Sequence, residues 1–224
     1  MRDQCRSFVR ALSLAALLYA ILSSPALAQP MQVLVFGDSL SSGFELPEEQ
    51  GFPSVLRRKL IADGYDVVVW NGSTPGETSG EALSNISTAL EYHPDLVIVE
   101  FGGNDMLEHV PPQQVYRNLD AMIAIIRGQG ARVILAGMLS LPKNGPRYVV
   151  GFDEIYPALA RARGAPLYPF FLQGVYGNPL LMKSDNEHPN ALGVRRIVAG
   201  IAPLVERSLK SIGRRDGLQV TRYR

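Results

Sequence analysis

The sequence predicts an α/β protein in which a parallel β-sheet is covered by helices on both faces. Strand-like runs alternate along the chain with stretches of helical periodicity, which is the pattern of repeated βαβ units. The strand-like runs are apolar without polar alternation, as expected for strands that are buried on both faces. A chain of 224 residues, 46% of them hydrophobic, is long enough to form one domain with a substantial core.

Four runs are β-branched or otherwise apolar, and a fifth run is weaker. Each is short and is followed by a polar loop or by a helical segment, which favours strands over buried helices. The predicted strands are Gln32–Phe36, Asp66–Trp70, Leu96–Phe101, Arg132–Met138 and, more weakly, Ala165–Tyr168.

Five segments carry apolar residues at helical spacing. In one of them Val115, Leu119 and Met122 fall on one face, and glycines at 128 and 130 end the helix. Pro203 lies inside the last segment, so we expect a kink or a break near Gly200. The predicted helices are Phe52–Asp63, Gly80–Glu91, Pro112–Gly128, Phe152–Arg163 and Ala191–Ile212.

The N-terminal segment, residues 1–28, is typical of a cleavable signal peptide. Three arginines precede the apolar run Ala11–Leu22, which is short for a membrane span, and a small-residue pattern ends at Ala28. We therefore expect cleavage after Ala28 and a periplasmic or secreted mature protein without a stable membrane anchor. The alternative is an uncleaved anchor. The main domain is predicted at residues 29–213, followed by a polar, aperiodic tail at 214–224.

Composition excludes several classes of function. The formal net charge is +1 and falls to −1 when residues 1–28 remove three Arg and one Asp, so no basic nucleic-acid surface is indicated. The single cysteine, Cys5, leaves with the signal peptide. The mature chain then has no disulfide, no cysteine nucleophile and no thiolate metal site, and we expect neither a metal nor a cofactor. The sequence leaves the oligomeric state open.

Polar residues with catalytic potential follow the predicted strands. Ser39 comes after the first strand, Gly76 after the second and Asn104 after the third, while Asp185 and His188 precede the last helix. In open α/β sheets ligands bind at the carboxyl ends of the strands, so we expect these five residues to converge there. Taken singly, each also has an ordinary structural explanation, such as a helix N-cap for Ser39 or a turn for Gly76. Their joint occurrence in this order favours a serine hydrolase.

The chain resembles the SGNH hydrolases, also called the GDSL esterase/lipase family, over nearly the whole mature sequence. The matching blocks are F-G-D-S-L with Ser39, the loop around Gly76, G-G-N-D with Asn104, and D-x-x-H-P-N with Asp185, His188 and Asn190. Within the family, V-E-F-G-G-N-D and the Leu141-Pro142 pair make it most similar to the bacterial periplasmic multifunctional thioesterase/lysophospholipase/arylesterase group. The resemblance implies a flavodoxin-like three-layer α/β/α fold with a five-stranded parallel sheet.

The resemblance also implies a mechanism for the reaction. His188 is expected to take the proton of Ser39 as the serine attacks an acyl carbonyl, with Asp185 orienting the imidazole. The oxyanion is expected to be held by the backbone N–H groups of Ser39 and Gly76 and by the side-chain amide of Asn104. A small-molecule acyl ester or thioester is the expected substrate.

The substrate pocket is less well defined by the sequence. An apolar acyl groove is expected from residues in two loops, although the same residues also suit loop anchoring against the core: Met106, Leu107, Leu139, Leu141, Pro142 and Tyr148. Thioesterase-like members carry Arg where this chain has Ser140, and the loop Met106–Pro111 also differs. Both departures leave the acyl-chain preference open.

Three other interpretations are possible. A carbohydrate O-deacetylase would use the same catalytic residues with an open, aromatic-lined site. A non-catalytic flavodoxin-like protein would bind a phosphate on the backbone of Gly37–Gly43, but this leaves Asp185, His188 and Asn104 unexplained. An α/β-hydrolase is disfavoured because the sequence around Ser39 lacks the G-x-S-x-G elbow.

Overall fold

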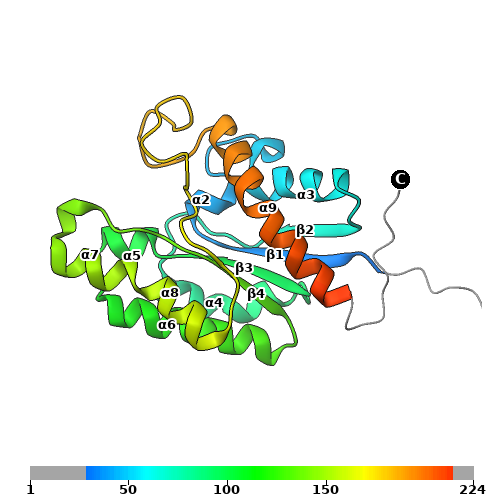
Figure 1. Cartoon of the computed structure of the whole chain (residues 1–224), viewed down its shortest axis with the longest axis horizontal. Coiled ribbons are helices and arrows are strands. Elements are labelled where there is room, and N and C mark those ends of the chain that lie inside the picture. The colour runs from blue at the N-terminus through cyan, green and yellow to red at the C-terminus, as the bar shows by residue number, and fades with distance from the viewer. Residues whose placement is uncertain (1–28, 214–224) are drawn as a thin grey trace, which may run out of the picture.

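The computed structural model describes residues 29–213, which form a three-layer α/β/α domain (Figure 1). Its sheet is five-stranded and parallel, in the order β2-β1-β3-β4-β5, which is the flavodoxin-like order. The predicted α/β class and five-stranded parallel sheet are therefore confirmed. The predicted signal peptide and C-terminal tail lie outside the described residues.

All five strands lie where the sequence places them, within a few residues at each end. The centres of β1, β3 and β4 are fully buried, which explains why they read as uninterrupted apolar runs. The strands are β1 Met31–Gly37, β2 Val67–Asn71, β3 Leu96–Glu100, β4 Arg132–Ala136 and β5 Leu167–Tyr168.

The helices cover both faces of the sheet. Helices α3 and α9 pack together on one face, and α4, α6 and α8 pack on the other (Figure 1). The main helices are α3 Phe52–Ala62, α4 Ser79–Leu90, α6 Pro112–Gly128, α7 Pro146–Asp153, α8 Ile155–Arg163 and α9 Ala191–Gly213. Short helices α2 Ser39–Ser42 and α5 Gly103–Leu107 follow β1 and β3, with 3₁₀ turns η1 Glu48–Gln50 and η2 Pro142–Asn144.

Two helix predictions need correction. The segment predicted as one helix from Phe152 is two helices, α7 and α8, that meet at Glu154, and α7 begins six residues earlier at Pro146. Helices α2 and α5 were not predicted because segments of four and five residues are too short to show a helical period.

The predicted break in the last helix is wrong, because α9 runs without interruption from Ala191 to Gly213 with Pro203 inside it. Gly200 serves packing instead. A Cβ atom at this position would lie 2.2 Å from the Tyr168 hydroxyl oxygen, so a larger residue here would displace the Tyr168 side chain. Within residues 29–213, no helix is both long and apolar enough to cross a membrane.

The strand order determines where the site lies. The chain adds β2 on one side of β1 and β3 on the other side, so the direction in which strands are added reverses at β1. Such a reversal leaves a crevice at the carboxyl ends of the two strands, where ligands bind in open α/β sheets. The loops that carry Ser39 and Asn104 emerge at this reversal.

We predict that Gly193→Ala destabilises the protein although alanine is the better helix former. A Cβ atom at Gly193 would lie 2.2 Å from the carbonyl oxygen of Leu181, so α9 and the preceding loop would have to separate. We expect a loss of about 1–3 kcal/mol in the free energy of unfolding, measured by chemical denaturation. Gly128→Ala is the matched control, because no atom lies within 4 Å of its Cβ position. Equal stabilities for the two variants would contradict this packing argument.

Candidate active site

Ser39 is the first residue of α2, directly beyond the carboxyl end of β1. The N-cap of this helix is Asp38, whose carboxylate accepts a hydrogen bond from the backbone N–H of Leu40 at 2.9 Å. Because Asp38 provides the cap, the hydroxyl of Ser39 is not needed for capping. It contacts His188 instead.

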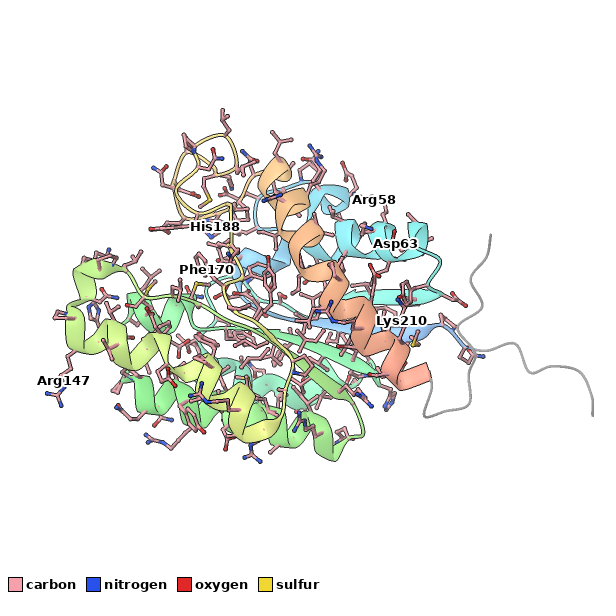
Figure 2. All side chains as sticks on the ribbon, viewed as in Figure 1. Arg58, Asp63, Arg147, Phe170, His188 and Lys210 are labelled. Atoms are coloured by element: carbon pink, nitrogen blue, oxygen red, sulfur yellow. The ribbon has the colours of Figure 1, made fainter. Side chains whose placement is uncertain are left out.

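Ser39, His188 and Asp185 form a continuous chain of hydrogen-bonding groups. Nε2 of His188 lies 2.9 Å from Oγ of Ser39, although 149 residues separate the two in sequence. Nδ1 of the same imidazole lies 2.9 Å from Oδ2 of Asp185. The two ring nitrogens therefore face a hydroxyl on one side and a carboxylate on the other. Figure 2 labels His188 at the edge of the domain.

The loop around Asp185 fixes the carboxylate and keeps it ionised. Its Oδ1 atom accepts the backbone N–H groups of Glu187 at 2.9 Å and His188 at 3.0 Å. Partial burial opposes ionisation of Asp185, but these two hydrogen bonds and the imidazole together outweigh it and lower the pKa to about 2. The Lys183 N–H also donates to the His188 carbonyl at 2.8 Å, which closes the turn.

A side chain from the loop after α2 covers the imidazole. The ring of Phe44 lies 5.0 Å from the ring of His188, centroid to centroid. Nζ of Lys183 lies 5.3 Å from the centre of the same phenyl ring, and Lys183 also forms an ion pair with Glu45. These contacts join the loop that carries the serine to the loop that carries the histidine.

The three candidate oxyanion donors differ in whether they already donate a hydrogen bond within the protein. Among residues 29–213, the backbone N–H groups of Ser39 and Gly76 donate to no protein acceptor. Gly76 has a φ of 83°, a left-handed conformation that glycine adopts without strain. The Asn104 amide, in contrast, already lies 3.2 Å from an Asp38 carboxylate oxygen and 3.0 Å from the Glu77 carbonyl.

The G-G-N-D block needs its first glycine for packing. Gly102 has a φ of 123°, and a Cβ atom there would lie 2.0 Å from the hydroxyl oxygen of Tyr156. That buried hydroxyl donates to the carbonyl of Phe101 at 2.8 Å. Tyr156 thereby holds the turn that leads from β3 into α5 and to Asn104.

Asp105 is a supporting residue that the sequence analysis missed. Its fully buried carboxylate accepts hydrogen bonds from the backbone N–H of Ser79 at 2.8 Å and from the Ser79 hydroxyl at 2.5 Å. The side chain of Asn118 donates to the same hydroxyl at 2.9 Å. Asp105 thus ties α5, which carries Asn104, to the start of α4, which follows the Gly76 loop. Its place next to Asn104 in the motif was the available signal.

Two acidic side chains near Ser39, those of Glu100 and Asp38, are buried. Glu100 ends β3, and neither of its carboxyl oxygens has a hydrogen-bond partner among the described residues. Burial is the main cause that holds the pKa of Glu100 well above its usual range, and the charge of nearby Asp38 acts in the same direction. The Ser41 hydroxyl and the Asp38 N–H oppose this shift, but they do not outweigh burial. Burial likewise raises the pKa of Asp38 to about 7. The sequence signal for Glu100 was a single charged residue at the end of an apolar strand.

The residues predicted for an acyl groove lie together but differ in accessibility. Met106 is buried in the core at 6% exposure, whereas Leu107 is 45% exposed. Leu141 and Tyr148 pack against the core, and the Tyr148 hydroxyl donates to the Val110 carbonyl at 2.9 Å. Leu139 and Pro142 are exposed. Anchoring therefore accounts for Met106, Leu141 and Tyr148, while the others face solvent near the site.

A cavity of about 1060 Å³ lies at the opposite edge of the sheet and contains none of these residues. Three arginines in its lining are engaged within the protein. Arg127 donates to the Arg163 carbonyl, Arg132 to the Ser211 hydroxyl, and Arg163 pairs with Asp120. Across residues 29–213, no group of three or more His, Cys, Asp or Glu side chains is arranged to hold a metal ion.

A serine whose hydroxyl meets an imidazole, which in turn meets an ionised carboxylate, is the arrangement that serine hydrolases use. Here it lies at the reversal point of a flavodoxin-like sheet. Fold and site together define the class of this protein as an α/β hydrolytic enzyme.

Comparisons with known proteins identify the family. Residues 35–196 match the GDSL-like lipase/acylhydrolase family. An arylesterase of Vibrio mimicus is 41% identical over 182 residues, which is 81% of this chain and 90% of the relative. The thioesterase 1/protease 1/lysophospholipase L1 of Escherichia coli K12 is 35% identical over 175 residues, 77% of this chain and 82% of the relative. The crystal structure of TesA superposes with a TM-score of 0.75 at 37% identity, covering 81% of this chain and 99% of that structure.

The chain therefore belongs to the GDSL-like lipase/acylhydrolase family, as the sequence motifs indicated, and it is an ester hydrolase.

We predict that Glu100→Gln removes a pH-dependent loss of stability. In the folded protein Glu100 stays protonated above its ordinary pKa of 4.5, whereas in the unfolded chain it ionises there. Unfolding is then favoured as pH rises above this value, by about 1.4 kcal/mol for each pH unit until the folded pKa is reached. The neutral glutamine has no such term.

The measurement is chemical denaturation of both proteins at a series of pH values. The stability of the variant relative to wild type should be constant below pH 4.5 and should rise above it. A difference that stays the same from acid to neutral pH would show that Glu100 ionises in the folded protein.

Proposed function

We propose that the protein is a serine esterase that hydrolyses carboxylic esters or thioesters with Ser39 as nucleophile, His188 as base and Asp185 as the group that orients His188. The observation that carries this proposal is the unbroken series of 2.9 Å contacts from Ser39 through His188 to Asp185. An ionised Asp185 favours the tautomer in which Nδ1 carries the proton, which leaves Nε2 free to accept one from Ser39.

The reaction proceeds in two halves. Oγ of Ser39 attacks the acyl carbonyl carbon while His188 takes its proton, and the carbonyl oxygen becomes an oxyanion. His188 then gives the proton to the departing alcohol or thiol, leaving an acyl group on Ser39. A water molecule attacks this acyl-enzyme, with His188 again as base, and releases the carboxylic acid and the free serine.

Three donors are proposed for the oxyanion: the backbone N–H groups of Ser39 and Gly76 and the side-chain amide of Asn104. The first two are free to donate as they stand. The Asn104 amide has to share a hydrogen that now faces Asp38 or Glu77. The 3.2 Å contact with Asp38 is the longer of the two, so this is the contact that we expect to yield to the substrate.

Relatives indicate the range of substrates. Those compared above are named as an arylesterase and as a thioesterase and lysophospholipase. We propose that this chain likewise accepts aryl and acyl esters, acyl thioesters and lysophospholipids. The acyl chain is assigned to the surface formed by Leu107, Leu141 and Pro142, above the anchored side chains of Met106 and Tyr148. Ser140 stands where thioesterase-like members carry an arginine, so this position adds no charge to the surface.

We also propose that the catalytic domain spans residues 29–213 between a signal peptide at 1–28 and a tail at 214–224. This proposal rests on the sequence pattern of the first 28 residues. The mature enzyme would then act in the periplasm or outside the cell.

Phosphate binding at the start of α2 is a weaker alternative. The N-cap carboxylate of Asp38 already accepts the Leu40 N–H at this helix end, and the helix has only four residues. A phosphate would have to displace or face a carboxyl group there.

We predict that Ser39→Ala abolishes ester hydrolysis while the protein stays folded. On p-nitrophenyl esters from acetate to palmitate, kcat should fall by about 10⁴–10⁶-fold because the nucleophile is absent. The matched control is Ser42→Ala in the same short helix, which should keep most of the activity. If Ser39→Ala remained as active as Ser42→Ala, Ser39 would not be the nucleophile. An optimum at acetate alone would favour the O-deacetylase alternative, and an optimum at longer chains would favour the acyl groove.

We predict that Asn104→Ala lowers kcat by about 10²–10³-fold with little change in KM, because an oxyanion donor acts mainly in the transition state. The control is Asn85→Ala, because the Asn85 amide donates to the side chain of Glu77 at 3.1 Å rather than facing Ser39. A rise in KM with unchanged kcat would instead place Asn104 in ground-state binding.

A further inference from the structure

Exposed apolar side chains gather at the edge of the domain that holds the site. Eleven large hydrophobic residues are exposed among residues 29–213, and seven of them follow the carboxyl ends of strands. The other four, Ile61, Trp70, Tyr92 and Ile125, lie elsewhere. Single exposed apolar residues need no explanation, but a concentration around one functional edge indicates an interaction surface. The seven are Phe44, Leu107, Leu139, Val150, Tyr176, Leu180 and Leu192.

One part of this surface is the segment 139–153, here called the α7 ridge, which contains η2 and α7. Leu139 is 43% exposed and Val150 is 72% exposed. Lys143 and Arg147 are also exposed on it, while its one acidic residue, Asp153, is half-buried and accepts the Ser140 N–H at 2.7 Å. Arg147 and Val150 are three positions apart on α7, so they share one helix face. The ridge therefore presents apolar and basic groups together.

The other part is the turn 173–181, here called the Leu180 turn. No charged residue occurs between Arg163 and Lys183, which is unusual for a segment with so much exposed surface. Tyr176 is 50% exposed and Leu180 is 75% exposed.

Hydrogen bonds hold the Leu180 turn in place. The Asn178 carbonyl accepts the N–H groups of Leu181 and Met182, and the Leu180 carbonyl accepts the Asn190 amide at 3.0 Å. Leu180 is thus held outward on an ordered turn.

The two parts flank the active site. The α7 ridge follows β4, and the Leu180 turn lies between β5 and α9, in the loop that leads to Asp185 and His188. In Figure 1 both project beyond the carboxyl ends of the strands. Figure 2 labels Arg147 on the ridge, with Phe170 and His188 toward the loop that carries the turn.

We propose that the α7 ridge and the Leu180 turn dock the enzyme on a phospholipid surface that carries anionic headgroups, with the active site facing the lipid. Val150 and Leu180 would enter the headgroup region, and Lys143 and Arg147 would contact the phosphates. This inference goes beyond the proposed reaction and does not depend on which residues carry out the chemistry.

Charge favours a lipid surface over a second copy of the chain. In a symmetric dimer the same patch meets itself, so the cations of the two α7 ridges would face each other. An anionic lipid surface satisfies the same cations while covering the apolar residues. Docking would also place the site where single-chain amphiphiles leave the lipid layer.

The test uses the chain with Ser39→Ala, so that lipid hydrolysis cannot alter the vesicles. Cosedimentation with phosphatidylcholine vesicles containing phosphatidylglycerol should show binding. The double variant Val150→Asp/Leu180→Asp should weaken this binding about tenfold or more, since two apolar anchors are lost. The matched control is Ile61→Asp, which changes a 44% exposed residue near the end of α3, away from the site, and should bind like the parent.

A second variant separates charge from apolar contact. Arg147→Ala should weaken binding to the anionic vesicles about fivefold, and much less to vesicles of phosphatidylcholine alone. With Ser39 restored, the Asp variants should still hydrolyse a short, water-soluble ester, which shows that they are folded and that the chemistry is separate from docking.

Three results would overturn the proposal. The parent could fail to sediment with vesicles of either composition. The double variant could bind as well as Ile61→Asp. Sedimentation without lipid could show a dimer that the double variant alone dissociates, which would assign the surface to a second copy.

Discussion

The active site depends on the buried carboxyl group of Asp38. One oxygen accepts the Leu40 N–H and fixes the start of α2, which sets the position of Ser39. The other oxygen faces the Asn104 amide at 3.2 Å, across the crevice between the ends of β1 and β3. A single side chain thus couples the proposed nucleophile to the proposed oxyanion donor. Because Asp38 caps the helix, the Ser39 hydroxyl is left free to contact His188. Because the sheet reverses here, Asn104 is near enough to be held by Asp38.

The buried acidic groups Glu100 and Asp38 lower the stability of the folded protein, while Asp38 also fixes the positions of Ser39 and Asn104. Glu100 lies fully buried without a hydrogen-bond partner, and burial raises the pKa of both Glu100 and Asp38. Asp105, in contrast, is fully satisfied by Ser79. The contrast separates two roles. Asp105 joins two helices and stabilises the loop arrangement, whereas Asp38 and Glu100 form a less stable pair next to the proposed nucleophile. A site that keeps such a pair is expected to lose stability toward alkaline pH.

The sequence predicted the sheet and placed the candidate site at the carboxyl ends of its strands, because both expectations follow from short-range patterns. Buried strands are apolar throughout, and the residues after their carboxyl ends meet in space whatever the rest of the fold does. It could not predict α2 and α5, which are shorter than the period that identifies a helix. The prediction made from the sequence at Gly200 was also wrong. A glycine that leaves room for the Tyr168 hydroxyl cannot be distinguished, from sequence alone, from a glycine that breaks a helix. Asp38 and Asp105 belong to the recognised motifs, but their hydrogen-bond donors, Leu40 and Ser79, can be identified only from the structure.

The exposed apolar residues around the site are a second unusual feature of this edge of the sheet. Val150 and Leu180 are 72% and 75% exposed, while the strand centres are completely covered. Hydrogen bonds hold Leu180 outward on an ordered turn. Buried carboxyl groups are usually hydrogen-bonded, but Glu100 is not. Large apolar side chains are usually covered, but Val150 and Leu180 are not. Both departures occur at the same edge of the sheet. Departures from local consistency are expected where function is selected. Their concentration at this edge therefore supports a single functional face, with chemistry at its centre and a docking surface around it.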